Sequence, residues 1–231
     1  MSLILSIETS TNICSVAVTH DGQCVFEKTD PTGPNHAEHL GTFIDEAFTY
    51  MEQRDLTPDC VAVSSGPGSY TGLRIGVSAA KGIAYGKDIP LVAIPTLQLL
   101  TVAPLLYHDE IPDEALFCPM IDARRMEVYA EIYDRSLNVV RKVQPDIVDE
   151  NTYRDLLDSH EIYFFGNGSE KCKDAITHPN AHFIDGIEPL ARYMAPLAEM
   201  RLRRGQTEDV AYFTPFYLKD FIAGKAKQQK P

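Results

Sequence analysis

The sequence lacks several features that would assign it to a class at once. It contains no tryptophan, and none of its apolar runs approaches the roughly 18–20 residues that span a bilayer. Residues 1–9 include neither a basic leader nor a small-residue cleavage site, so we expect no signal peptide and no membrane anchor. The 14 glycines and 15 prolines follow no period, which argues against a repeat architecture. We therefore expect a globular cytoplasmic protein of 231 residues.

Cysteine is also scarce, and the number and spacing of the cysteines do not indicate a disulfide-linked scaffold. An odd number of cysteines without a Cys-x-x-Cys pair argues against a disulfide framework and against a zinc ribbon. We expect buried free thiols in a reducing compartment. The five cysteines are Cys14, Cys24, Cys60, Cys118 and Cys172.

Basic residues are outnumbered, with 21 Lys and Arg against 33 Asp and Glu and a formal charge of −12. A field of that sign repels phosphate, so we do not expect the whole surface to grip nucleic acid or an anionic membrane. The last 31 residues differ, because they hold seven basic against three acidic side chains. The sequence therefore leaves open a local contact made by basic residues near the C-terminus.

Apolar patterning predicts the same order of elements twice along the chain. In the first half we expect strands over 3–7, 14–18, 23–28, 61–63 and 91–94, and helices over 36–54, 73–85 and 96–106. In the second half we expect strands over 117–121, 127–133, 139–143, 162–165 and 182–184, and helices from 151, from 169 and over 189–204.

This repeat predicts an internally duplicated α/β protein. Each half opens with a hairpin and continues with strand–helix units, which favours a mixed sheet with helices on both faces. Two such halves leave a cleft between them. We place the boundary in the Pro- and acid-rich stretch 104–112, which gives subdomains over 1–107 and 108–231.

A glycine-rich loop over 66–72 separates an expected strand from an expected helix. Its spacing fits neither the dinucleotide fingerprint nor the P-loop, because Thr71 stands where the former needs glycine. Two interpretations remain: an anion site at the helix N-terminus, or a tight turn that lets the helix pack closely. The following helix carries small residues at spacings of three and four, including Gly72, Gly76 and Ala80, which indicates close approach by the protein's own sheet or by a helix of another chain.

Two further segments hold side chains of the kind that bind ligands. His36 and His39 begin the first helix, but no third ligand stands out, so we favour surface histidines over a metal site. The loop 8–12 combines a carboxylate with hydroxyls and would face its counterpart 122–125 across the cleft. It could hold Mg²⁺-phosphate or be an ordinary polar turn. No catalytic constellation can be assembled from these residues.

Four segments resemble the TsaB family, also called YeaZ. They are residues 4–11, residues 65–76 continuing through 79–82, residues 121–129 and residues 213–219. These segments occur in family order and span nearly the whole chain. The glycine loop with its helix is the most specific of them.

The resemblance implies a protein of the actin-like ATPase (ASKHA) superfamily, with two ribonuclease-H-like subdomains. It implies a non-catalytic scaffold in the formation of N6-threonylcarbamoyladenosine at A37 of tRNAs reading ANN codons. The catalytic paralogue TsaD and the ATPase TsaE are the implied partners, and tRNA is contacted through that complex. A homodimer through the same helices is expected when the paralogue is absent.

The resemblance also assigns roles to particular residues, with no catalytic residue and no metal ligand among them. A vestigial nucleotide loop is expected at Glu8, Thr9, Ser10, Gly66 and Gly68. Glu8 stands where active ATPases of the superfamily have aspartate, so we expect no tightly bound cofactor and ATP or ADP only within the complex. The partner-binding helix faces are expected at Leu40, Phe43, Ile44, Ala47, Gly72, Gly76, Ala79, Ala80 and Ile83.

An alternative function stays open from the sequence. The chain could be a stand-alone ATP-binding or metallopeptidase-like enzyme of the same superfamily, which would bind ATP or Zn²⁺ by itself. We also expect deletion of residues 225–231 to change tRNA affinity only slightly, because a chain of net charge −12 needs a partner to supply most phosphate contacts.

Overall fold

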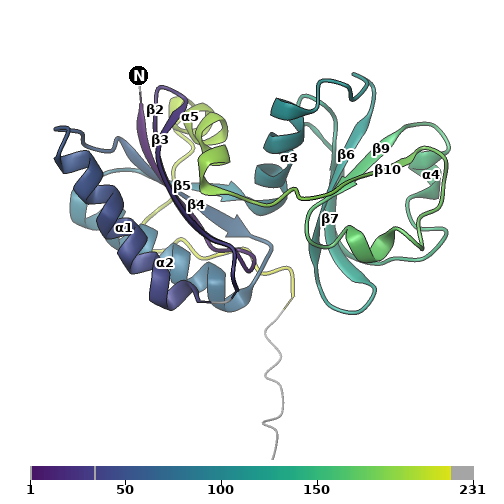
Figure 1. Cartoon of the computed structure of the whole chain (residues 1–231), viewed down its shortest axis with the longest axis horizontal. Coiled ribbons are helices and arrows are strands. Elements are labelled where there is room, and N and C mark those ends of the chain that lie inside the picture. Colours follow the sequence, from purple (N-terminus) through teal and green to yellow (C-terminus); the bar gives the residue numbers. More distant parts are fainter. Residues whose placement is uncertain (1, 34, 220–231) are drawn as a thin grey trace, which may run out of the picture.

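The computed structural model describes residues 2–33 and 35–219, which form two five-stranded sheets with their helices (Figure 1). The first half contains β1 (Leu3–Glu8), β2 (Cys14–His20), β3 (Gln23–Asp30), α1 (His36–Glu52), β4 (Cys60–Gly66), α2 (Tyr70–Lys87), β5 (Leu91–Pro95) and α3 (Thr96–Tyr107). The second half contains β6 (Leu116–Asp122), β7 (Glu127–Tyr133), β8 (Val139–Ile147), α4 (Arg154–Leu157), β9 (Ile162–Phe165), the 3₁₀ turn η1 (Glu170–Cys172) and β10 (Ala181–Ile184). The 3₁₀ turn η2 (Ala191–Met194) and α5 (Ala195–Arg203) follow.

The two sheets repeat one topology. Their strand orders are β3-β2-β1-β4-β5 and β10-β9-β6-β7-β8, so β6 occupies the central place that β1 has in the first sheet. Each central strand pairs antiparallel with the next strand along the chain and parallel with a later one. The predicted α/β class with two duplicated mixed sheets is confirmed.

The first sheet is covered on both faces because its inner strands are apolar and buried, whereas the edge strand β3 is largely polar and exposed. Leu5 and Ile7 belong to the same core cluster as α1 and α2, whereas Ile4 packs with residues of α3 and α5. This division follows from the alternation of side chains along a strand. The helices α1 and α2 therefore lie on one face of the first sheet, and α5 lies on the other (Figure 1).

The helix α3 lies between the two sheets. Leu99 and Val102 pack into the core of the first half, whereas Leu97 and Leu100 pack with Phe117 and other residues of the second. A helix that is apolar around most of its circumference is typical of such a buried position. The two halves are thus joined through a shared helix as well as through the chain.

Two helices predicted in the second half are far shorter than expected. The helix expected from residue 151 is the four-residue α4, and the one expected from residue 169 is the 3₁₀ turn η1. The Thr152 hydroxyl bonds Asp149 instead of capping a helix, and Tyr153 has a φ of 66°. The capping-box pattern was therefore misleading, because the side chain found an upstream partner.

The chain returns to the first half after β10. The helix predicted over 189–204 is divided into η2 and α5, and its residues Met194, Leu197 and Ala198 pack on the first sheet. The expected subdomain over 108–231 grouped this segment with the second half. The basic residues 225–231 lie outside the described residues.

The segment after α5 continues along the first half toward the cleft. The amide of Glu208 donates to the carbonyl of Leu91 (2.8 Å), and the amide of Phe216 donates to that of Ser65 (2.7 Å). The Lys81 ammonium donates to the carbonyls of Ala211 (3.2 Å) and Phe213 (2.9 Å). We call residues 205–219 the C-terminal strap.

Within the described ranges, no helix is both long enough and apolar enough to cross a membrane. The cysteines form no disulfide, as predicted, and four of them are buried. Cys24 is the exception, because it is exposed on β3 at the edge of the first sheet.

Candidate functional site

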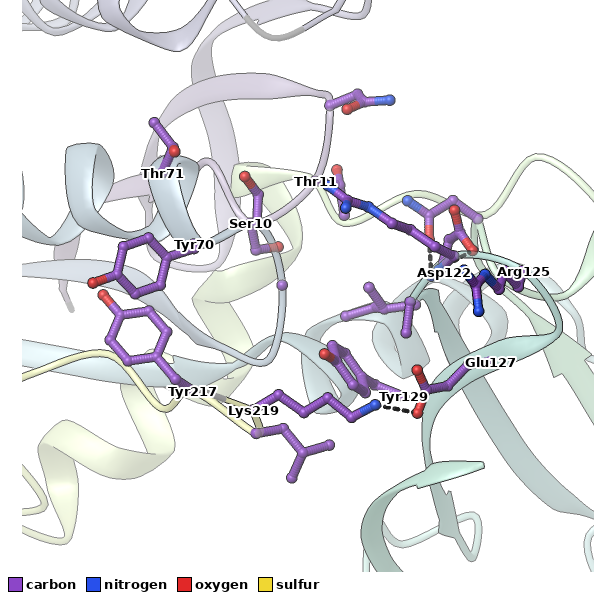
Figure 2. A pocket seen from close by; sticks show the side chains of 18 of the residues that line it. Ser10, Thr11, Tyr70, Thr71, Asp122, Arg125, Glu127, Tyr129, Tyr217 and Lys219 are labelled. Carbon is purple, nitrogen blue, oxygen red and sulfur yellow. Dashed lines mark hydrogen bonds and ion pairs between the residues drawn. The ribbon is translucent and has the colours of Figure 1, made fainter. Parts of the chain in front are cut away.

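A cleft of about 1110 Å³ lies between the two halves (Figure 2). Its first wall comes from the loop after β1 and from the start of α2, and its second wall from the end of β6 and the turn that follows. Tyr217, Leu218 and Lys219 of the C-terminal strap complete the lining. The prediction that the loops 8–12 and 122–125 face each other across a cleft is confirmed for residues 10–12 and 122–125.

Glu8 does not line this cleft. Its side chain is fully buried at the end of β1, and its Oε1 accepts a hydrogen bond from the Ser10 amide at 2.5 Å. Burial raises the pKa of the Glu8 carboxyl to about 7. The carboxylate that was considered as a Mg²⁺-phosphate ligand is therefore sealed beneath the loop.

The seal is made by glycines of α2. The Thr9 hydroxyl donates to the carbonyl of Gly72 at 2.8 Å. A Cβ on Gly72 would lie 2.0 Å from the Thr9 carbonyl oxygen, and one on Gly76 would lie 2.2 Å from the Thr9 hydroxyl oxygen. The small residues on this face of α2 therefore allow the protein's own loop to approach.

The glycine loop itself bonds the rest of the first wall. The Ser69 hydroxyl accepts from the Gly72 amide (3.2 Å), and the Ser69 amide donates to the Ser10 carbonyl (2.6 Å). A Cβ on Gly68 would lie 2.3 Å from that same carbonyl oxygen. The structure shows the close-packed turn of the two interpretations, and the anion site stays a prediction.

The five residues of the predicted vestigial loop are thus divided by the structure. Ser10 and Gly68 line the cleft, whereas Glu8 and Thr9 are buried behind them. Gly66 has a φ of +104°, and a Cβ there would lie 2.3 Å from the Phe216 carbonyl oxygen. That position faces the C-terminal strap.

The second wall is more open and more charged. Asp122, at the end of β6, is exposed and forms an ion pair with Lys171. Glu127 forms an ion pair with Lys219 of the C-terminal strap, which closes one side of the cleft (Figure 2). Between these acids, Arg124 (φ 73°) and Arg125 (φ 50°) form the turn.

Aromatic side chains occupy the lower part of the cleft. Tyr70 and Tyr217 lie side by side with ring centroids 4.6 Å apart, and Tyr129 lies across from them (Figure 2). The Arg74 guanidinium lies over the Tyr70 ring at 5.3 Å. Sequence reasoning treated residues 213–219 only as part of a family resemblance and missed that Tyr217 and Lys219 line the cleft. The sequence feature that indicates their role is the aromatic and basic composition near the end of an otherwise acidic chain.

The residues predicted for partner binding fall into two groups. Five are buried in the first half's own structure: Leu40, Ala47, Gly72, Gly76 and Ala80. Four are half-buried on the outer side of the helices: Phe43, Ile44, Ala79 and Ile83.

A second row of small residues points outward from α2. Ser78, Gly82 and Gly86 follow one another at a spacing of four and are exposed. A Cβ on Gly82 or Gly86 would meet nothing within 4 Å. The residues predicted for partner binding from the sequence include none of these three, although they follow the same spacing as Gly72, Gly76 and Ala80.

The two histidines of α1 differ from each other. His36 is buried, and its Nε2 bonds the Thr11 carbonyl at 2.8 Å, so the prediction of a surface histidine is wrong there. His39 is partly exposed, with Nε2 3.5 Å from Asp30 Oδ2. Among the described residues, no three His, Cys, Asp or Glu side chains are arranged to hold a metal ion.

The duplicated sheets and the cleft between them define a duplicated α/β protein with two mixed five-stranded sheets. Two solved structures share the fold over almost the whole chain. "YeaZ from Pseudomonas aeruginosa" has a TM-score of 0.77 and 24% identity, covering 94% of this chain and all of the other. A protein described as having "similarity to peptidase YEAZ from Pseudomonas aeruginosa" has a TM-score of 0.79 and 23% identity, covering 95% and 100%.

Sequence comparison gives the family. The family model described as "TsaD: tRNA N6-adenosine threonylcarbamoyltransferase" matches residues 31–227. The tRNA threonylcarbamoyladenosine biosynthesis protein TsaB of Escherichia coli (strain K12) is 29% identical over 231 aligned residues, 96% of each chain. TsaB of Haemophilus influenzae is 28% identical and covers 96% of this chain and 95% of its own. The chain belongs to this family and, within it, to the TsaB (YeaZ) group.

Proposed function

We propose that this protein is a non-catalytic subunit in the biosynthesis of N6-threonylcarbamoyladenosine at A37 of tRNA. The observation that carries the proposal is the match over 96% of both chains to a relative named as a tRNA threonylcarbamoyladenosine biosynthesis protein. On this proposal the chain works in the cytosol, a reducing compartment in which its buried free thiols stay reduced.

The state of Glu8 supports a role without catalysis. A carboxylate that served a reaction in the cleft would have to reach the cleft, and Glu8 is fully buried beneath Ser10. Moving its ionised form to the cleft would require the loop 9–12 to part from α2, where Thr9 is bonded to Gly72. We therefore propose that the isolated chain holds no tightly bound nucleotide, and that ATP or ADP is relevant only within a complex.

The outer face of α1 and α2 supports a role in pairing. Ile44 and Ile83 are half-buried there beside the exposed row of Ser78, Gly82 and Gly86. Small exposed residues let a second helix come close, and the half-buried apolar side chains beside them gain further burial when it does. We propose that this face pairs with a TsaD-type partner, and with a second copy of the chain when that partner is absent. TsaE and tRNA would join through the assembled complex.

Reconstitution tests the proposal. The protein is mixed with its TsaD and TsaE counterparts, a source of threonylcarbamoyl-adenylate, ATP and tRNA, and modified A37 is measured by mass spectrometry of nucleosides. We expect modification that depends on this chain. A reaction that runs equally well without the chain would overturn the proposed role.

A pair of variants tests the pairing face. Gly82→Glu places a charged side chain on the outward row without filling any space inside the protein, so it should weaken pairing by at least about 10-fold while the fold is retained. Arg204→Glu, an exposed position just after α5 on the opposite face of the sheet, should pair as the parent does. Size-exclusion chromatography with light scattering measures both, and equal pairing by the two variants would exclude this face.

Calorimetry separates this proposal from the stand-alone enzyme. The isolated chain is titrated with ATP and Mg²⁺ and, separately, with Zn²⁺. We expect no saturable heat in either experiment. Binding at micromolar concentration with one-to-one stoichiometry would favour the enzymatic alternative.

A further inference from the structure

The lining of the cleft carries positive charge without an acidic partner, which stands out in a chain of net charge −12. Its two acids are already neutralised, since Asp122 pairs with Lys171 and Glu127 with Lys219. Among the residues that the structure describes, the guanidinium groups of Arg124 and Arg125 make no ion pair with a carboxylate. The local surplus is therefore two guanidinium groups on one exposed turn.

This turn is held in an unfavourable backbone conformation. Both arginines have positive φ, a backbone conformation that favours glycine and asparagine. A side chain in the left-handed region is disfavoured because its Cβ comes too close to the following carbonyl oxygen. The turn nevertheless keeps the hairpin bonds from the Ala123 amide to the Glu127 carbonyl and from the Glu127 amide to the Arg124 carbonyl. The arginines are thus presented at the cleft at some cost to stability.

The opposite side of the cleft offers aromatic surface. Tyr70 and Tyr217 come from α2 and the C-terminal strap, and their rings lie side by side (Figure 2). Arg74 extends the cationic surface beyond them, over the Tyr70 ring. Arginines on one wall and tyrosines on the other provide what an unpaired nucleotide strand requires, namely cations for phosphates and flat rings for bases.

We propose that this cleft binds a single-stranded segment of RNA, with backbone phosphates on Arg124 and Arg125 and a base stacked at the Tyr70–Tyr217 pair. The inference rests on the proposed function, because that function places the chain in a complex that acts on tRNA, and it adds a direct contact between this chain and the RNA. It assigns the RNA contact to the cleft and not to the basic residues 225–231. A duplex would keep its bases stacked inside and could not use the tyrosines.

RNA binding by the full chain tests the cleft directly. A fluorescently labelled single-stranded 12-mer is titrated with the protein, and its anisotropy is followed from 50 to 200 mM KCl. The double variant Arg124→Asn/Arg125→Gly removes both charges and supplies residues that suit the turn, so folding should be retained. We expect at least about a 10-fold loss of affinity and a salt slope lower by about 1.4, since each phosphate contact on a single strand contributes roughly 0.7.

Matched variants control for charge and for aromatic content. Arg203→Ala/Arg204→Ala removes two consecutive arginines at the end of α5, and Tyr212→Leu removes an exposed tyrosine that does not line the cleft. Both should bind RNA as the parent does. Tyr217→Leu should lose about 5-fold or more in affinity, because one stacked base contributes on the order of 1–3 kcal/mol.

Several results would overturn the inference. They are undetectable binding of the 12-mer at 50 mM KCl, equal affinity of Arg124→Asn/Arg125→Gly and the parent, equal affinity for a duplex of the same sequence, or displacement of the 12-mer by micromolar ATP. Deletion of residues 225–231 should leave the affinity within about 2-fold, whereas a larger loss would move the contact to the tail. Pairing with the TsaD counterpart is a separate measurement, so failure of the proposed function and failure of this inference can be told apart.

Discussion

The same position has opposite surroundings in the two halves of the molecule. Glu8 ends the central strand β1 and is fully buried, whereas Asp122 ends the corresponding strand β6 and is exposed beside Lys171. The first loop is closed because α2 supplies glycines that let Thr9 pack against it. In the second half only the short turn η1 follows β9, and the loop stays open. One duplicated fold thus yields a sealed wall and an open, charged wall.

The buried carboxyl groups of the two halves also have different surroundings. Glu8 is buried without a cation, and burial raises the pKa of its carboxyl to about 7. Asp146 of β8 is buried with a bidentate partner, since Arg141 donates to its two oxygens at 2.8 and 2.6 Å and the Tyr153 hydroxyl donates at 2.7 Å. Burial would raise the pKa of Asp146, but these donors hold it below its ordinary value.

The largest effect is expected where the first wall is sealed. Gly72→Val would place a branched side chain against the Thr9 carbonyl, which a Cβ alone approaches to 2.0 Å. We expect the free energy of unfolding to fall by about 4 kcal/mol or more, in the upper range for overpacking. Urea denaturation measures it. Gly82→Ala in the same helix has free space and should raise stability by about 0.5–1 kcal/mol. Equal effects of the two would contradict the sealing.

The next effect concerns the buried acid of that wall. Between pH 4.5, the ordinary pKa of the carboxyl, and about pH 7, Glu8 stays protonated in the folded state but ionises in the unfolded state. The free energy of unfolding of the parent therefore falls as pH rises through this window. Glu8→Gln is neutral at every pH. We expect its stability relative to the parent to improve by about 2–3 kcal/mol between pH 5 and pH 8, measured by urea denaturation at both values.

The corresponding variant of the second half sharpens the comparison. Asp122→Asn loses only an exposed ion pair and should change the free energy of unfolding by less than about 1 kcal/mol at either pH. A pH-dependent gain in stability as large as that of Glu8→Gln would show that the carboxyl groups at the two strand ends have similar surroundings.

A smaller loss is expected from the paired acid. Arg141→Met keeps much of the side chain's bulk but leaves Asp146 buried with the Tyr153 hydroxyl and Gln144 as its remaining donors. We expect a loss of about 2 kcal/mol in the free energy of unfolding, because a buried charge is left without its counter-ion. Lys142→Met, at the exposed neighbouring position, should stay within about 0.5 kcal/mol of the parent. Thermal and urea denaturation of Arg141→Met and Lys142→Met measure both changes in the free energy of unfolding.

Most of the fold could be predicted because long apolar strands and an amphipathic α1 follow clear periods. The mixed sheet of each half followed from the hairpin at 20–22 and from the repeated order of elements, whereas the strand order came only from the structure. The short helices failed because local side-chain bonds, such as that between Thr152 and Asp149, competed with the capping pattern.

The site was harder to predict because it depends on which side of a helix or loop is covered. Glycines at 72, 76, 82 and 86 look alike in the sequence, but only the first two meet Thr9. The loop 8–12 was placed at the cleft as predicted, although burial of Glu8 could not be read from its neighbours. The contribution of Tyr217 and Lys219 depends on the path of the C-terminal strap, which no local pattern encodes.

The return of α5 to the first sheet also sets an order for synthesis. The core around Ile4 and Ile94 is completed by Met194, Leu197 and Ala198, which leave the ribosome nearly 100 residues after β5. The second half has all of its strands before the first half has its last helix. A nascent chain arrested after β10 therefore still exposes the part of its first sheet that η2 and α5 will cover, and the half that is made first is the one that is finished last.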